Sequence, residues 1–204
     1  MKTVRRVGIW GGTFDPIHIG HLAAAQDAAE TLQLDRVYFV PNGKAPHKKE
    51  TAVSEAADRV AMVKRAIADN PLFALSLIEV ERPGKSYLLE TLRQFRQGFE
   101  TDTKMYCLLG RDVFSGLHTW HQPEMLLAEF QLVVLDRPAS EPVDWPSVER
   151  HFPDIRRQIL TVHVLQLQIS SEEIRSRVAE ARSIRYYVPD SVYSYIQEHG
   201  LYRG

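Results

Sequence analysis

Hydrophobic and polar positions follow one another along the chain in a strand-then-helix rhythm. Short apolar runs typical of buried strands occur at residues 7–10, 37–41, 73–80, 104–110 and 130–136, with a weaker run at 160–167. Apolar residues recur at helical spacing between them, over residues 21–32, 54–69, 86–97 and 123–130. This alternation predicts an α/β fold: a doubly wound parallel sheet with helices on both faces and right-handed crossovers.

The pattern changes after residue 166, where two helices are expected without a strand between them. Ser170 or Ser171 is expected to cap the first helix, and the second lies between Pro189 and Gly200. The proline-containing stretch 138–152 is interpreted as a surface excursion within the domain. We therefore expect a single domain over residues 1–204, with a core at 1–166 and a small C-terminal helical part at 167–204.

Composition narrows the class of protein without identifying a ligand. The chain has 204 residues and a formal net charge of -1, which argues against a polyanionic nucleic-acid partner. The single cysteine, Cys107, lies in an apolar run and is interpreted as a buried thiol. No signal peptide or membrane span is recognised, so a soluble cytoplasmic protein is expected. The sequence is compatible with a homo-oligomer and does not decide the oligomeric state.

The stretch GGTFDPIHIGHL, residues 11–22, directly follows the first expected strand. Gly11 and Gly12 can leave backbone amides open to a ligand, and Gly20 lets another group approach the helix start. His18 and His21 are three residues apart, so both imidazoles project from one face of the first helical turn. Imidazoles beside unpaired amides at a helix N-terminus predict an anion site.

Other interpretations of the same stretch are weaker. Neither a GxxxxGK[ST] loop nor a GxGxxG fingerprint follows the first strand, which excludes two common phosphate-binding motifs. A zinc site needs three or four ligands, and only Asp15 stands near the histidines, so no metal ligand is expected. Packing histidines without a role are the remaining alternative.

Two motifs together resemble the nucleotidyltransferase superfamily. GGTFDPIHIGHL resembles its HxGH signature, and ISSEEIR, residues 169–175, resembles its ISSTxIR signature. The letters HIGH also name a motif of class I aminoacyl-tRNA synthetases, but the chain is short for a synthetase and lacks a KMSKS-like loop. The resemblance implies a Rossmann-like fold and an enzyme that joins a nucleoside triphosphate to a phosphate-bearing acceptor.

The second motif also has a physical interpretation of its own. Ser170 and Ser171 offer hydroxyl groups at a helix start, and Arg175 follows one turn later on the same face as Ser171. These groups can converge on phosphate oxygens. An ordinary capped helix with a solvent-facing arginine is the alternative when SSEEIR is considered alone. Glu172 replaces the usual threonine, so it is expected either to point away or to leave binding to the serines and the backbone.

Further segments resemble the nicotinate mononucleotide adenylyltransferases. VPNGKAPHKK, residues 40–49, resembles that family's loop after the second strand, with Lys44, His47 and Lys48 over the site, although a solvated basic loop is an alternative. KSYLLETL resembles the SYTxxTL segment and contains Ser86, with Leu88 replacing a threonine that frames the pyridine pocket in relatives.

The segment after the fourth expected strand resembles the family's GxD motif and a following tryptophan. Gly110 is expected to admit a ribose, and Asp112 to accept hydrogen bonds from ribose hydroxyls, a role that suits a carboxylate shielded from water. Trp120 offers a face for the pyridine ring, with a core tryptophan as the alternative. The amides around Trp120 and His121 are expected to donate to the nicotinate carboxylate.

The family resemblance implies that AMP passes from ATP to nicotinate mononucleotide, with Mg²⁺ arriving with ATP. The implied catalytic residues are His18, His21 and Arg175. The implied ATP-binding residues are Gly11, Gly12, Thr13, Phe14, His18, Gly20, His21, Gly110, Asp112, Ile169, Ser170, Ser171 and Arg175. The implied acceptor-binding residues are Thr13, Lys44, His47, Lys48, Ser86, Asp112, Trp120 and His121. Nicotinamide mononucleotide, phosphopantetheine or FMN as acceptor, and a non-catalytic nucleotide sensor, remain open alternatives.

Overall fold

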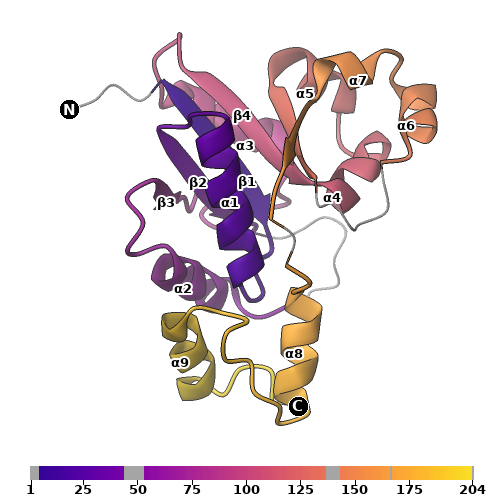
Figure 1. Cartoon of the computed structure of the whole chain (residues 1–204). Helices are drawn as coiled ribbons and strands as arrows, with labels where there is room; N and C mark the ends of the chain where they lie inside the picture. Colours follow the sequence, from indigo (N-terminus) through magenta and orange to yellow (C-terminus); the bar gives the residue numbers. More distant parts are fainter. Residues whose placement is uncertain (1–4, 44–52, 137–142, 166, 204) are drawn as a thin grey trace.

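The computed structural model describes residues 5–43, 53–136, 143–165 and 167–203 (Figure 1). Its centre is one six-stranded sheet in the order β3-β2-β1-β4-β5-β6, and all neighbouring strands are parallel. The strands are β1 (Arg6–Gly12), β2 (Arg36–Pro41), β3 (Phe73–Leu75), β4 (Lys104–Gly110), β5 (Gln131–Asp136) and β6 (Leu160–His163). This strand order confirms the expected doubly wound, Rossmann-like α/β fold.

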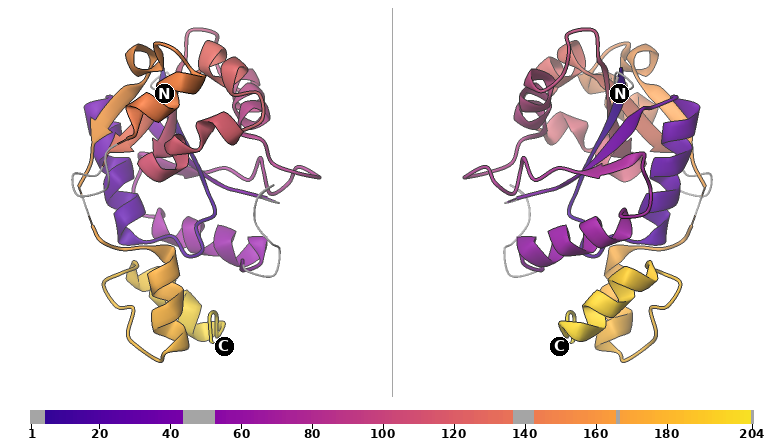
Figure 2. Two further views of the ribbon diagram at one scale, coloured as in Figure 1. Left: turned by 90° about the vertical axis from the view of Figure 1, so that its right-hand side faces the viewer. Right: turned by 90° about the vertical axis from the view of Figure 1, so that its left-hand side faces the viewer.

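Helices cover both faces of this sheet (Figure 2). The expected helices are α1 (Ile19–Thr31), α2 (Ala56–Ala66), α3 (Leu88–Gln97), α5 (Pro123–Glu129), α8 (Ser171–Ala179) and α9 (Asp190–Glu198). On one face, α1 and α2 bury a first hydrophobic cluster against the sheet, and α8 and α9 extend this cluster beyond the carboxyl ends of the strands. On the other face, α3 and α5 bury a second cluster. Two separate cores therefore hold the sheet between them.

Four short elements were not expected from the sequence: α4 (Arg111–Ser115), a 3-10 turn η2 (Leu117–Thr119), α6 (Trp145–His151) and α7 (Ile155–Gln158). The stretch interpreted as a surface excursion thus contains α6. This helix forms because the Asp144 side chain accepts a hydrogen bond from the Ser147 amide at 3.0 Å, while Pro146 lies in the first turn. A proline is tolerated there because the first amides of a helix have no partner inside it.

Two strands are shorter than the hydrophobic runs that predicted them. β3 ends at Leu75, although apolar residues continue to Val80, because the chain then leaves the sheet through turns that bury Glu79. β6 ends at His163 and α8 begins at Ser171. Alternation of apolar residues reports burial, and buried segments need not pair with a neighbouring strand.

The carboxyl ends of the strands meet at one edge, and α8 and α9 lie beyond that edge in Figure 1. The crossovers diverge between β1 and β4, because the strand order continues through β2 on one side and β5 on the other. Ligands of doubly wound sheets bind at this switch point. None of the helices in the described ranges is long and apolar enough to cross a membrane.

Candidate active site

The two histidines lie together at the switch point, where β1 passes into α1. His18 is the N-cap of α1 and His21 is its third residue, and their ring centroids are 3.7 Å apart. His18 is only 3% exposed. A side chain on Gly20 would begin 3.1 Å from His18 Nδ1, so the glycine leaves the space that this ring occupies. The structure thus brings both imidazoles to one face of the helix start.

A hydrogen bond to His21 Nδ1 selects one tautomer of the neutral ring. The His18 backbone N–H donates to His21 Nδ1 at 3.3 Å, so the neutral His21 ring carries its proton on Nε2. The rings of Trp10 and Phe14 pack edge-on against His21 at centroid distances of 5.7 Å and 5.3 Å. This packing leaves His21 oriented as an Nε2–H donor.

Phe14 itself does not present its ring to a ligand. Its side chain is 3% exposed and packs over Gly12, where an added Cβ would lie 2.9 Å from Phe14 Cζ. The part of Phe14 that remains for nucleotide contact is its main chain. A Cβ added at Gly11, by contrast, would meet nothing within 4 Å, so this position is open beside the strand end.

The second motif docks directly on the first. Ser171 Oγ donates to the Pro16 carbonyl at 2.9 Å, and Arg175 donates through one guanidinium nitrogen to the Asp15 carbonyl at 2.7 Å. Ser170 is the N-cap of α8, and its Oγ accepts from the Glu173 amide at 3.0 Å. Two segments about 155 to 160 residues apart therefore form one continuous surface.

Three details refine the picture expected at these helix starts. The Ile19 amide of α1 donates to the Tyr187 carbonyl at 3.0 Å, so it is not among the amides left for an anion. Ile169 is half-buried against the first hydrophobic cluster, and Glu172 is exposed. The His21 amide likewise donates to the His18 carbonyl at 3.0 Å, so the expectation of unpaired amides at the start of α1 was wrong for Ile19 and His21.

The fourth strand ends in a more exposed arrangement than expected. Asp112 is exposed, and its carboxylate folds back over Gly110, where an added Cβ would lie 2.8 Å from Asp112 Oδ1. Gly110 therefore makes room for this carboxylate. A carboxylate that binds a ribose was expected to be shielded from water, and Asp112 is not shielded. It does lie at the end of β4, as expected.

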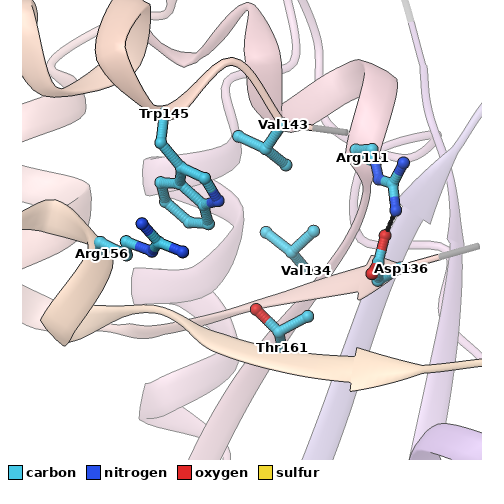
Figure 3. A pocket seen from close by; sticks show the side chains of 7 residues that line it. All are labelled: Arg111, Val134, Asp136, Val143, Trp145, Arg156 and Thr161. Atoms are coloured by element: carbon cyan, nitrogen blue, oxygen red, sulfur yellow. Dashed lines mark ion pairs between the residues drawn. The ribbon is translucent and has the colours of Figure 1, made fainter. Parts of the chain in front are cut away.

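A cavity of about 310 Å³ lies beside this strand end, between α4, α6 and the last two strands (Figure 3). Arg111 and Asp136 form an ion pair on its wall, and His163 Nδ1 lies 3.2 Å from Asp136 Oδ2. The Arg156 guanidinium carbon lies over the Trp145 ring, 5.2 Å from the centroid of that ring. None of the residues that line the cavity is an expected site residue. The ion pair ties α4, and with it Asp112, to the end of β5.

Two of the residues expected on the acceptor side, Ser86 and His121, lie near the start of α3. Ser86 is buried just before this helix, and the ring of Tyr87 lies 4.5 Å from that of His121. Trp120 and Leu88 are both half-buried against the second hydrophobic cluster. Trp120 is therefore partly a core residue. The expected Lys44, His47 and Lys48 lie outside the described residues.

Comparison with known proteins decides the family. Residues 9–177 match the model of the cytidylyltransferase-like family. A probable nicotinate-nucleotide adenylyltransferase of Roseiflexus sp. (strain RS-1) is 42% identical to this chain, over 97% of this chain and 98% of the relative. The chain belongs to the nicotinate-nucleotide adenylyltransferase family. The family's probable enzyme from Thermomicrobium roseum is 43% identical, over 97% of this chain and 92% of the relative.

Solved structures share the fold of this nicotinate-nucleotide adenylyltransferase family member. The nicotinic acid mononucleotide adenylyltransferase of Plasmodium falciparum, complexed with NaAD, superposes with a TM-score of 0.77 over 97% of both chains. Its sequence is 20% identical. At that identity the likeness establishes the α/β fold with its C-terminal helices.

Sequence reasoning missed Arg59, a buried residue of α2 that supports the loop between β1 and α1. Arg59 is 3% exposed and donates to the Thr13 carbonyl at 3.0 Å, to Asn42 Oδ1 at 3.0 Å and to the Ser54 carbonyl at 3.1 Å. Burial lowers the Arg59 pKa, and the charge of Asp15 opposes that shift. The sequence did contain a signal for Arg59. It occupies the same buried face of α2 as Met62, one turn later, where an apolar residue would be expected.

Asn42, the second missed residue, fixes Thr13 from the neighbouring strand. Asn42 Nδ2 donates to Thr13 Oγ1 at 3.4 Å, and the Asn42 amide donates to the Gly12 carbonyl at 2.9 Å. Thr13 is thus held through its carbonyl by Arg59 and through its hydroxyl by Asn42. This support orders the loop between β1 and α1 before any ligand binds.

Glu79 is a buried carboxyl group behind the acceptor side. It is 5% exposed, and Thr91 Oγ1 donates to it at 2.8 Å. A Cβ at Gly43 would lie 2.4 Å from the Glu79 carbonyl oxygen, so only glycine fits where the chain enters the 44–52 stretch. Burial raises the Glu79 pKa, against the hydrogen bond from Thr91 and the charge of Arg82.

The raised pKa gives Glu79 a predictable effect on stability. Between its ordinary pKa of 4.5 and its raised folded-state pKa, the folded protein binds more protons than the unfolded chain. The contribution of Glu79 to the free energy of unfolding therefore falls as pH rises through this window, and Glu79→Gln is expected to remove that contribution. Urea unfolding at about pH 5 and about pH 7 measures it, with exposed Glu81→Gln as control. Parallel curves for wild type and Glu79→Gln would contradict the prediction.

Proposed function

We propose that the protein transfers the adenylyl group of ATP to nicotinate mononucleotide, forming deamido-NAD and releasing pyrophosphate. The observation that carries this proposal is the docking of Ser171 and Arg175 onto the carbonyls of Pro16 and Asp15. It joins two helix N-termini, two imidazoles and a guanidinium at the sheet's switch point, where a triphosphate finds donors on several sides. The full-length similarity to nicotinate-nucleotide adenylyltransferases selects the acceptor.

The reaction is an in-line displacement at phosphorus. An oxygen of the acceptor's 5'-phosphate forms a bond to the α-phosphorus of ATP, and the bond from that phosphorus to the bridging oxygen of pyrophosphate breaks. The nucleophile is an ionised phosphate, so no general base is required. Catalysis then consists of holding the two phosphates in line and stabilising the charge that develops between them.

The histidines are proposed to stabilise the α-phosphoryl group. His21 donates through Nε2–H, since its Nδ1 already accepts from the His18 amide. His18 lies against it with its ring 3.7 Å away and adds a second donor to the same oxygens. The amides after Gly11 and the Thr13 hydroxyl are proposed to complete the set, and Arg59 holds Thr13 in place through its carbonyl.

Arg175 and Ser170 are proposed to receive the leaving pyrophosphate. Arg175 uses one donor on the Asp15 carbonyl and has others to offer, since a guanidinium carries five N–H groups. The Ser170 hydroxyl accepts from the Glu173 amide and keeps its own proton for a phosphate oxygen. The Ser171 proton is directed to Pro16, so Ser171 acts by fixing the helix instead of binding phosphate.

Mg²⁺ is proposed to enter with the triphosphate, held by phosphate oxygens and water, and when bound it neutralises part of their charge. Across the ranges that the structure describes, no group of three or more histidine, cysteine, aspartate or glutamate side chains is arranged to hold a metal ion. The nearest buried carboxylate, Asp15, already accepts hydrogen bonds on both of its oxygens. The protein's own contribution is therefore to orient the phosphates.

The acceptor is proposed to lie between the start of α3 and the turn after α4. Trp120 offers part of its face to the pyridine ring. The expected Trp120 amide already donates to the Leu117 carbonyl at 3.0 Å, so the His121 amide is proposed to meet the nicotinate carboxylate, with Ser86 on the same side. Gly110 and Asp112 are proposed to meet a ribose. Lys44, His47 and Lys48 are proposed to neutralise acceptor phosphate from the loop after β2.

The decisive experiment follows pyrophosphate release from ATP and Mg²⁺ with either nicotinate or nicotinamide mononucleotide. We expect release with the acid form and a strong preference for it, because backbone amides donate to a carboxylate more strongly than to a carboxamide. Equal rates would contradict the acceptor assignment and indicate dual specificity. No release with either, while ATP still binds, would favour the other acceptors or a nucleotide sensor.

A further inference from the structure

The Asp15 carboxylate is buried and is held by donors of the protein itself. Its side chain is 3% exposed. The Tyr202 hydroxyl donates to Asp15 Oδ1 at 2.6 Å, and the Ser54 amide donates to Asp15 Oδ2 at 3.1 Å. Both carboxylate oxygens are therefore held by donors of the protein itself, and Tyr202 is one of the two.

The main chain of the same residue faces the phosphate donors. The Asp15 carbonyl accepts from Arg175 at 2.7 Å, and the next carbonyl, that of Pro16, accepts from Ser171 at 2.9 Å. A shift of the Asp15 side chain would move these two carbonyls as well, because they belong to the same short turn. The position of Arg175 thus depends on what holds the Asp15 carboxylate.

We propose that Tyr202 is a positioning residue for adenylyl transfer: its hydroxyl fixes Asp15 and, through the Asp15 main chain, aims Arg175 at the leaving pyrophosphate. This inference rests on the proposed function and assigns a role to a residue 187 positions away from the loop that it holds. Tyr202 touches neither substrate nor reacting atoms in this role. It acts only through Asp15 and Arg175.

The chemistry of the contact suits a permanent hold. Burial raises the Tyr202 pKa, and its hydrogen bond to the Asp15 carboxylate raises it further, so the hydroxyl keeps its proton and remains a donor. A hydrogen bond to a buried carboxylate is among the stronger ones in proteins, and its loss leaves a charged group short of a donor. Without this bond, the loop that contains Asp15 can change conformation, and Arg175, which donates to the Asp15 carbonyl, moves with it.

Tyr202→Phe tests the proposal, and Tyr195→Phe is its matched control. Tyr195 makes the same kind of bond in the same part of the molecule, donating to Asp58 Oδ1 at 2.7 Å, away from the phosphate donors. We expect Tyr202→Phe to worsen kcat or the KM for ATP by about 10-fold while the KM for nicotinate mononucleotide changes less than about two-fold. Tyr195→Phe should leave all three constants within about two-fold of the wild type.

A double-mutant cycle separates positioning from a general structural role. If Tyr202 acts through Arg175, Tyr202→Phe in an Arg175→Ala background should change the kinetics by less than about two-fold. An undiminished loss of about 10-fold in that background, or equal kinetic losses in the two tyrosine variants, would overturn the proposal.

Equilibrium binding of Mg·ATP without acceptor provides a readout that does not depend on turnover. Weaker binding by Tyr202→Phe, with Tyr195→Phe unchanged, supports the positioning role even if the acceptor has been assigned wrongly. Unchanged ATP binding together with unchanged kcat would overturn it. Failure of the wild-type protein to release pyrophosphate from any acceptor would count against the proposed function alone.

Discussion

Replacing His18 by alanine is expected to lower kcat on the order of 100-fold to 1,000-fold, because a preorganised donor to the developing phosphoryl charge is lost. The ring is 3% exposed and sits in a space that Gly20 leaves open, so its orientation costs little when the substrate binds. Steady-state kinetics with ATP and nicotinate mononucleotide measure the effect, and the thermal midpoint of unfolding shows whether the fold is kept.

The control for this substitution is His199→Ala. His199 is exposed at the end of α9 and stacks on Tyr195 at a centroid distance of 3.9 Å, outside the candidate site. Its loss should leave kcat within about two-fold of the wild type. If His18→Ala keeps both turnover and ATP affinity within about three-fold, the assignment of His18 to the α-phosphoryl group is wrong.

Replacing Arg59 by methionine is expected to destabilise the protein by about 3 kcal/mol, because three hydrogen bonds from a buried cation disappear and leave their acceptors without a donor. The lost bonds are those to the carbonyls of Thr13 and Ser54 and to Asn42 Oδ1. Methionine keeps much of the volume, so the loss reports polar contacts and not a large cavity. Urea unfolding measures the change in free energy.

Arg65→Met on the same helix is the matched control for Arg59→Met. Arg65 is exposed, and its guanidinium lies over the Tyr195 ring at 4.4 Å. A cation–π contact at an exposed site is worth about 0.5–1 kcal/mol, so the control should lose no more than that. Equal losses in the two variants would show that Arg59 is not the support of the Thr13 loop.

The parts of the fold that the sequence predicted are those in which one face of an element is buried along its whole length. The helix α1 is such a case: Ala24, Ala25 and Ala28 are at most 1% exposed, and they recur at helical spacing. The helix α4 spans only Arg111–Ser115, which is too short to show a period. In β3 the apolar run continues past Leu75 because burial continues there, although strand pairing does not.

The candidate site divides in the same way. His18 and His21 were predicted to share a face because local helix geometry alone decides it. The contacts from Arg59 to Thr13 and from Tyr202 to Asp15 depend on tertiary packing, and no local pattern specifies which partner a buried polar group will find. The charged residue within the apolar stripe of α2 was the one sign that a polar partner must exist.

The union of residues 15 and 16 with residues 171, 175 and 202 has a consequence for how the enzyme is made. Chains are synthesised from the N-terminus, and the sheet can assemble from β1 to β6 while later residues are still missing. During that time the Asp15 carboxylate lacks Tyr202 and the phosphate site lacks Arg175. The site is therefore completed only after residues 171, 175 and 202 have been synthesised and have folded onto the loop between β1 and α1.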